Sequence, residues 1–197
     1  MKLILVRHGE TKWNKNGKLL SFTDIPLNNK GLEQAKKTAK ILKNNKFDYI
    51  ISSPLKRAYE TAKEINKFHN LKIETSILLK ERNYGDFEKT DYLKLNLREI
   101  RDKNLYHEYN METPEEFENR IKSFLECKCL KTHGKKILIV SHSGTIKMIL
   151  YHLLKIKESF EIFRKQVNKS NASISTIEFD KNFNVINFEI GNNQHLI

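Results

Sequence analysis

Two side chains that suit an anionic substrate, Arg7 and His8, stand directly after the apolar run Leu3-Ile4-Leu5-Val6. Four apolar residues, two of them β-branched, predict a short buried strand. The pair therefore lies at the carboxyl end of a strand, where open α/β sheets bind their ligands. Gly9 allows the backbone to turn sharply there. Because a guanidinium offers a planar set of donors and an imidazole acts as a base or nucleophile, the segment favours an anion-binding reactive site.

Three further segments place comparable side chains after predicted strands. Arg57 falls in the first turn of a predicted helix, where free backbone N–H groups and the helix dipole already favour an anion. His142 directly follows an apolar strand, as His8 does. Glu81 ends the segment that follows the third strand. Four strand exits thus supply two histidines, two arginines and a carboxylate.

This set of side chains suits phosphoryl transfer. A metaphosphate-like transition state requires charge stabilisation more than covalent work, and Arg7, Arg57 and a protonated His142 would provide it without a metal. A neutral His8, held in one tautomer by a backbone carbonyl, would attack phosphorus in line. Glu81 would protonate the leaving alkoxide and later take a proton from water, if its site keeps it protonated.

The composition fits one globular domain of 197 residues with a sizeable core, since 39% of the residues are hydrophobic. The apolar runs are too short to span a bilayer, and the N-terminal run, which ends at Arg7, is too short for a signal peptide. Cys127 and Cys129 cannot frame a disulfide scaffold and lack the second half of a zinc site. A reducing cytoplasmic setting is therefore expected.

The net charge of +12 is spread along the chain without a tight lysine or arginine block. This distribution favours a solvated basic surface over a nucleic-acid patch. A positive field also attracts anionic substrates. We expect a small phosphorylated metabolite as partner, with no nucleic acid and no membrane, and a monomer or homodimer.

Alternating strands and helices predict an α/β fold, a three-layer α/β/α sandwich with a mostly parallel central sheet. The expected strands are Lys2–Val6, Tyr49–Ser52, Lys72–Thr75, Lys136–Ser141, Ser173–Phe179 and Val185–Ile190, the last two as an edge hairpin. The expected helices are Gly31–Asn44 with Asn28 as cap, Pro54–His69 with Ser53 as N-cap, a helix from the capping box at Thr113 towards Leu130, and Thr145–Leu154. We expect a single domain over residues 1–197 with an insertion at about 85–112.

The motifs together resemble the histidine phosphatase superfamily, in its branch of phosphoglycerate mutases and small-molecule phosphatases. The matching segments, in the family's order between residue 2 and about 150, are residues 7–14, 23–27 with Lys30 and Gly31, 52–58 with Thr61 and Ala62, 81–88 and 141–144. The resemblance implies a phosphohistidine on His8 and Glu81 as proton donor.

The resemblance also assigns the binding residues and needs no cofactor and no metal. It implies that the phosphoryl group is held by Arg7, Asn14, Arg57 and His142. It points to further substrate contacts from Thr11, Ser21, Tyr84 and Ser143. The insertion at about 85–112 lies where this family builds its substrate lid.

The chain departs from the family's pattern at three places. Leu20-Ser21-Phe22 stands where the family often has Gln-Gly-Trp, and Lys89 follows Glu88 where the phosphatases commonly have glycine. The paired arginines with which mutases bind the carboxylate of phosphoglycerate are missing, and Arg98 and Arg101 are the nearest candidates. The sequence therefore favours a phosphomonoester hydrolase of small anionic metabolites.

Three alternatives stay open at this point. The first is a cofactor-dependent phosphoglycerate mutase. The second is a metal hydrolase with His8, His142 and Glu81 as ligands, although two arginines aimed at the same place would repel a dication. The third is a catalytically inactive module that binds phosphorylated ligands, against which the intact His8 and Glu81 argue.

Overall fold

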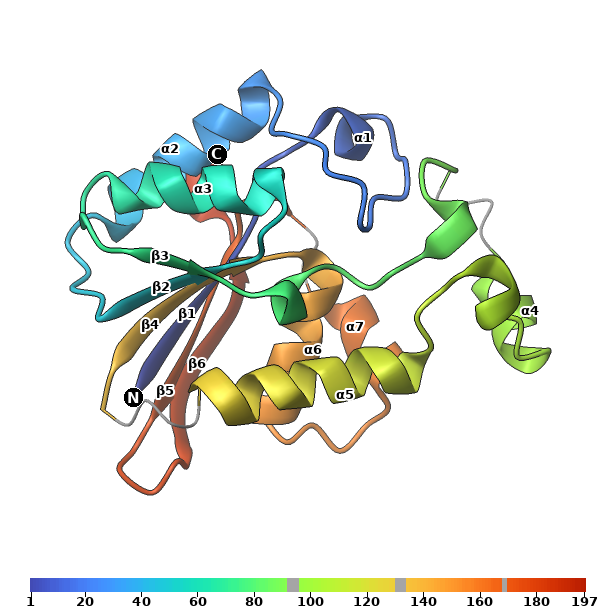
Figure 1. The fold of residues 1–197 in the computed structure, drawn as a ribbon. Coiled ribbons are helices and arrows are strands. Elements are labelled where there is room, and N and C mark those ends of the chain that lie inside the picture. The colour runs from blue at the N-terminus through green and yellow to red at the C-terminus, as the bar shows by residue number, and fades with distance from the viewer. Residues whose placement is uncertain (92–95, 130–133, 168–169) are drawn as a thin grey trace.

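The computed structural model describes residues 1–91, 96–129, 134–167 and 170–197. Six strands form a sheet in the order β3-β2-β4-β1-β5-β6 (Figure 1). They are β1 (Lys2–Arg7), β2 (Tyr49–Ser52), β3 (Ile73–Thr75), β4 (Lys136–Ser141), β5 (Ile174–Phe179) and β6 (Val185–Asn192). The first four run parallel, whereas β5 and β6 form an antiparallel hairpin at one edge. The predicted mostly parallel sheet with its edge hairpin is confirmed.

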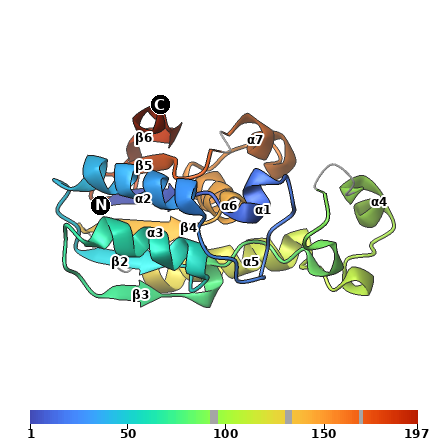
Figure 2. The same ribbon diagram turned by 90° about the horizontal axis from the view of Figure 1, so that it is seen from above.

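Helices cover both faces of the sheet, which confirms the three-layer sandwich (Figures 1 and 2). One face carries α2 (Asn29–Leu42) and α3 (Lys56–Asn66), and the other carries α5 (Pro114–Phe124), α6 (Ser143–Leu153) and α7 (Phe160–Gln166). The short helices α1 (Lys12–Lys15) and α4 (Leu97–Asp102) lie beyond one end of the sheet. Single 3-10 turns occur at Ile77–Leu79, Gly85–Phe87, His107–Tyr109 and Gln194–Leu196.

Strand β1 shows why the sheet is buried on both faces. Leu3 and Leu5 pack in the cluster beneath α5, α6 and α7, whereas Ile4 and Val6 pack beneath α2 and α3. Successive side chains of a strand point to opposite faces, so a strand covered on both sides must be apolar throughout. This is the physical basis of the uninterrupted apolar run at the N-terminus.

Two of the predicted helix starts are confirmed, and one is wrong. The Asn28 side chain accepts a hydrogen bond from the Gly31 N–H (2.7 Å), and Thr113 forms a capping box with Glu116. However, α3 begins at Lys56 with no side-chain cap, so Ser53 is not its N-cap. The Ser53 hydroxyl is instead hydrogen-bonded to His142 Nε2 (2.8 Å), and its N–H donates to the Val140 carbonyl (2.9 Å). These bonds join Ser53, which directly follows β2, to the end of β4 and to the residue after it.

Some helices differ from the prediction. The helix expected to run towards Leu130 is α-helical only to Phe124 and continues as a single π turn, Leu125–Cys129, while residue 130 lies outside the described residues. Helices α1, α4 and α7 were not predicted, because each has seven residues or fewer and carries too little periodicity to be read. In the part of the chain that the structure describes, no helix is long and apolar enough to cross a membrane.

The segment between β3 and α5 forms a small apolar cluster of its own. Tyr84, Ile100, Tyr106 and Met111 pack there with Leu19 from the loop after α1. Two backbone hydrogen bonds join the segment to that loop, from the Leu19 N–H to the Thr90 carbonyl and from the Lys89 N–H to the Leu19 carbonyl, both 2.9 Å. The segment is therefore fastened to residues 17–20, which form one wall of the pocket described next.

Candidate active site

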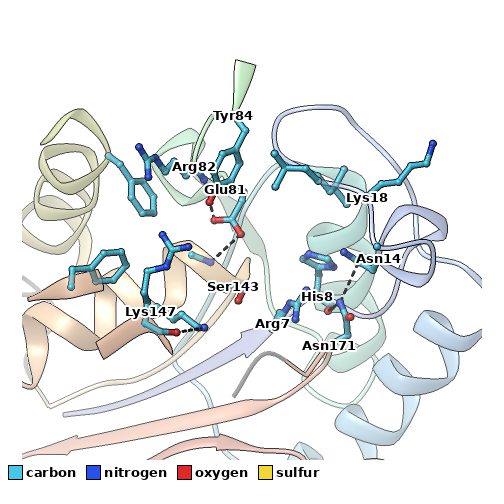
Figure 3. Close-up of a pocket in the computed structure, with 17 residues that line it drawn as sticks. Arg7, His8, Asn14, Lys18, Glu81, Arg82, Tyr84, Ser143, Lys147 and Asn171 are labelled. Carbon is cyan, nitrogen blue, oxygen red and sulfur yellow. Dashed lines mark hydrogen bonds between the residues drawn. The ribbon is translucent and has the colours of Figure 1, made fainter. Parts of the chain in front are cut away.

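The carboxyl ends of the four parallel strands meet at one edge of the sheet because these strands are neighbours in the order β3-β2-β4-β1. The His8 N–H donates to the Ser141 carbonyl of β4 (2.9 Å). A pocket of about 390 Å³ opens at this edge (Figure 3). Of the predicted site residues, six line this pocket: Arg7, His8, Asn14, Glu81, Tyr84 and Ser143. The other four, Thr11, Ser21, Arg57 and His142, are fully buried around it.

His8 has the geometry of a nucleophile. Its Nδ1 lies 2.7 Å from the Gly9 carbonyl, so Nδ1 carries the proton and Nε2 keeps its lone pair. Burial, followed by the charges of Arg57 and Arg7, lowers the pKa of His8 well below 6.5. The ring is therefore neutral at physiological pH, as the sequence predicted.

Arg7 and Arg57 supply the positive charge around His8. Burial lowers the pKa of each guanidinium to about 10, so both stay charged at neutral pH. Arg57 donates to two backbone carbonyls of the loop after α1, those of Ser21 (2.6 Å) and Thr23 (2.9 Å). The carboxylate of Glu88 in turn accepts hydrogen bonds from the N–H and the hydroxyl of Thr23, which fixes that loop.

His142 stands beside His8, with the two ring centroids 5.1 Å apart. Burial and the neighbouring Arg57 lower the pKa of His142 well below 6.5. The expectation of a protonated His142 is therefore wrong for this site at neutral pH, because a second buried cation next to Arg57 is disfavoured. The charge comes from the two arginines.

Unpartnered nitrogen atoms concentrate at this place. Within the described residues, five buried side-chain nitrogens have no hydrogen-bond partner, and three of them are Arg7 Nε, Arg57 Nε and His142 Nδ1. Buried polar groups are nearly always hydrogen-bonded, so such atoms call for an explanation. Three such nitrogens, all on charged or polar side chains, lie around His8. This is what we expect of an anion-binding site, because a bound anion would accept their hydrogen bonds.

Glu81 is held at the N-terminus of α6 by backbone donors. Its Oε1 accepts from the N–H groups of Arg82 (3.0 Å) and Thr145 (3.1 Å), and its Oε2 accepts from the Gly144 N–H (3.0 Å). Oε2 thus keeps the lone pair on which a transferable proton can sit. A Cβ on Gly144 would lie 2.5 Å from Glu81 Oε1, so glycine makes room for this carboxylate.

Arg120 of α5 fixes the backbone on which Glu81 sits. Its guanidinium donates to the carbonyls of Leu78 (2.7 Å), Lys80 (3.0 Å) and Glu81 (3.1 Å). Glu112 pairs with it through both carboxylate oxygens, at 2.7 and 2.9 Å. The position of the carboxylate in the pocket is therefore set by a helix far away in the sequence.

Asn14 and Thr11 form the cap of α1. Asn14 Oδ1 accepts from the N–H and the hydroxyl of Thr11 (3.2 and 3.0 Å), and Asn14 lines the pocket. Asn171, which sequence reasoning missed, donates to the same oxygen (3.3 Å) and to the His8 carbonyl (3.1 Å). Its position before β5 could have been noticed, because an antiparallel β5 begins at the edge where β1 ends.

The remaining residues predicted to contact the substrate are of two kinds: one is buried behind the pocket wall, and two line the pocket. The Ser21 hydroxyl accepts from the Tyr84 N–H (3.0 Å) and is fully buried, so it orders the wall on which Tyr84 stands. Tyr84 and Ser143 face the cavity itself. Sequence reasoning missed the pocket-lining side chains Lys18, Arg82, Lys147, Phe160 and Arg164.

The structure also places the residues of the alternative readings. Arg98 and Arg101 lie on α4, do not line the pocket, and pair with Asp102 at the surface. Among the described residues, no group of three or more His, Cys, Asp or Glu side chains is placed to hold a metal ion, so His8, His142 and Glu81 do not form such a set.

Comparisons with known proteins agree with the geometry. The family model of the histidine phosphatase superfamily (branch 1) matches residues 3–189, and the chain belongs to this superfamily. The uncharacterised phosphatase PhoE of Bacillus subtilis is 38% identical over 193 residues, which cover 98% of this chain and 95% of that protein. Phosphoserine phosphatase 1 of Hydrogenobacter thermophilus is 32% identical over 201 residues, covering 94% and 90%.

A solved structure supports the same assignment. A mutant phosphoserine phosphatase from Entamoeba histolytica in complex with phosphoserine superimposes with a TM-score of 0.81 at 31% identity, covering 100% of this chain and 99% of that one. The resemblance read from the motifs is confirmed, and phosphatase is the general class of activity that these relatives support.

Proposed function

We propose that this member of the histidine phosphatase superfamily hydrolyses small anionic phosphate monoesters through a phosphohistidine on His8, with Glu81 as proton donor and without a metal. The observation that carries the proposal is the neutral His8, with a free Nε2, beside the unpartnered nitrogens of Arg7, Arg57 and His142. A phosphoryl group at Nε2 would give these nitrogens their hydrogen-bond partner.

In the first step, His8 Nε2 attacks phosphorus and the bond from phosphorus to the ester oxygen breaks. The departing oxygen takes the proton from Glu81 Oε2, so the alcohol leaves neutral. In the second step, the Glu81 carboxylate takes a proton from water as the water oxygen attacks phosphorus. The N–P bond then breaks, which releases inorganic phosphate and returns His8 to its neutral form.

Two cations suit this chemistry because charge stabilisation is the main demand of phosphoryl transfer. Arg57 is buried and anchored on the carbonyls of Ser21 and Thr23 before the substrate arrives, so this guanidinium needs little reorganisation. Asn14, whose side-chain oxygen accepts hydrogen bonds from Thr11 and Asn171, adds a polar group to the same wall. We also propose the segment of about 85–112 as the lid over the pocket; Lys89 and Thr90 fasten it to Leu19, and residues 92–95 lie outside the described part of the chain.

Hydrolysis is proposed over the mutase reaction because the candidate carboxylate clamp is absent from the pocket. Arg98 and Arg101 are occupied with Asp102 on α4, and both are largely exposed. Relatives that act on phosphoserine support small phosphorylated acids as the substrate class.

The proposal is tested by acid-quench trapping with a ³²P-labelled substrate. We expect an acid-labile, base-stable phosphoprotein that disappears in His8→Ala, and turnover that EDTA leaves unchanged. With 3-phosphoglycerate and a catalytic amount of 2,3-bisphosphoglycerate, we expect phosphate release with little 2-phosphoglycerate. Full turnover by His8→Ala, or an EDTA loss reversed by a dication, would contradict the mechanism.

A further inference from the structure

Ser53, the first residue after β2, is fully buried, and its side chain lies beside the imidazole of His142. Its hydroxyl neither caps α3 nor lines the pocket. The Ser53 Oγ lies 2.8 Å from His142 Nε2, whereas His142 Nδ1 has no hydrogen-bond partner within the described residues. Nδ1 is therefore the ring nitrogen of His142 that remains for the phosphoryl group proposed at His8.

The ring of His142 is neutral at physiological pH, because burial and the charge of Arg57 lower its pKa well below 6.5. A neutral imidazole carries one proton, so one of its nitrogens donates a hydrogen bond and the other accepts one. With the proton on Nδ1, the ring donates to a phosphoryl oxygen. With the proton on Nε2, the lone pair of Nδ1 would repel that oxygen. The tautomer thus decides whether His142 can bind the phosphoryl group.

The hydroxyl of Ser53 favours one of the two tautomers. If Nε2 carried the proton, it would donate to Ser53 Oγ, which already accepts from the Leu55 N–H (3.4 Å). The hydroxyl proton would then have no acceptor among the described residues. If the hydroxyl donates to Nε2 instead, its proton has a partner and the ring proton lies on Nδ1. Because buried polar groups are nearly always hydrogen-bonded, the second arrangement is the stable one.

The backbone of Ser53 is held independently of its hydroxyl. The Ser53 N–H donates to the Val140 carbonyl of β4 (2.9 Å), and the Ser53 carbonyl accepts from the Ser52 hydroxyl (2.9 Å). His142 precedes the first residue of α6, and its side chain does not cap that helix. Removal of the Ser53 hydroxyl therefore takes away the hydrogen bond of the His142 ring and leaves the backbone contacts between β2 and β4 in place.

We propose that Ser53 is a positioning residue of the phosphoryl site: its hydroxyl donates to His142 Nε2 and thereby keeps the ring proton on Nδ1, from which it is donated to the phosphoryl group. The inference rests on the proposed function and adds the residue that prepares His142 for it. His8 also carries its proton on Nδ1, but there the Gly9 carbonyl accepts that proton and leaves Nε2 as the nucleophile. Two neighbouring histidines in the same tautomer thus offer the phosphoryl group a lone pair and an N–H, because each has a different partner.

The tautomer is measured by ¹⁵N-NMR of the imidazole rings at pH 7, since protonated and unprotonated ring nitrogens have well separated chemical shifts. His142→Ala identifies the signals of His142 among those of the seven histidines. In the natural chain we expect the proton on Nδ1. Ser53→Ala should give a mixture of both tautomers, as should Ser53→Cys, which is close to serine in size and is a weak donor. A proton on Nε2 in the natural chain, or Nδ1 alone protonated in these variants, would overturn the proposal.

The binding of orthovanadate, which mimics the phosphoryl group, is measured on the same proteins by calorimetry. In Ser53→Ala the dissociation constant should rise by the reciprocal of the fraction of rings that keep the proton on Nδ1, which is about tenfold when about a tenth keep it. The matched control is Ser52→Ala, which removes an equally buried hydroxyl that donates to a backbone carbonyl. It should keep both the tautomer and the dissociation constant of the natural chain. Equal weakening in both variants, or weakening without a change of tautomer, would mean a general structural effect and refute the proposal.

The outcome is separable from that of the proposed function, because the spectra need no turnover. If the natural chain hydrolyses no phosphate monoester, the proposed function fails. The spectra of the natural chain, Ser53→Ala and Ser53→Cys then still decide whether Ser53 sets the tautomer of His142. If the natural chain hydrolyses these esters with the His142 proton on Nε2, the proposed function stands and the role of Ser53 is refuted.

Discussion

Replacing Glu81 by glutamine tests both the proton donor and the backbone donors that hold it. The carboxylate accepts three backbone N–H groups, two on Oε1 and one on Oε2. A glutamine has one acceptor oxygen. With that oxygen at the Oε1 position, its NH₂ group meets the Gly144 N–H, and two donors face each other.

The structure sets the size of the stability effect. Leaving a buried donor unsatisfied costs about 1–3 kcal/mol. For a domain of this length each kcal/mol lowers Tm by about 2–4 °C. The loss of the acid should add a roughly hundredfold decrease of kcat on alkyl phosphate esters, which is the usual effect of a positioned general acid.

The assay compares an alkyl ester with p-nitrophenyl phosphate, since the nitrophenolate leaves without a proton. Glu81→Gln should lower kcat on 3-phosphoglycerate by roughly a hundredfold and on p-nitrophenyl phosphate by much less. The control for stability is Asp180→Ala, which removes the acceptor of the Asn182 and Asn184 N–H groups in the β5–β6 turn. That turn lies at the end of the sheet opposite to the pocket, where the Phe179 N–H donates to the Met1 carbonyl. Asp180→Ala should therefore lower Tm and leave kcat unchanged.

Two results would refute the reasoning. Equal losses on both esters would mean that Glu81 is not the proton donor. An unchanged Tm in Glu81→Gln would mean that the three backbone donors do not hold the carboxylate as the structure describes.

Two further predictions concern stability. Lys89→Gly should raise the free energy of unfolding, measured by urea titration, by about 0.5–1 kcal/mol. The reason is that Lys89 has φ 69°, a left-handed conformation that costs a residue with a side chain about 1–2 kcal/mol. The control Lys89→Ala keeps a Cβ and should give no such gain. Because folding lowers the pKa values of His8 and His142, the unfolded chain binds more protons than the folded protein below pH about 6.5. Stability should therefore fall as the pH drops from 7 to 5, by up to roughly 1.4 kcal/mol per pH unit for each histidine, and equal urea midpoints at pH 7 and 5 would contradict this.

Local signals in the sequence determined most of the fold. The apolar run Leu3 to Val6 is buried on both faces, and the capping residues Asn28 and Thr113 lie at the expected helix starts. Such signals can be read because each depends on residues within a few positions of each other. The same reasoning predicted that His8 and His142 directly follow the ends of strands.

The tertiary structure decided what depends on contacts distant in sequence. Glu81 finds its donors 63 and 64 residues later, at Gly144 and Thr145, and no local pattern records that pairing. Helix α7 has seven residues and is held by Lys147, 17 positions before Arg164, so its two pocket residues could not be predicted. The sequence pattern shows which side chains follow the end of a strand. Packing between the layers decides which of these side chains lie around the same pocket and whether each is protonated.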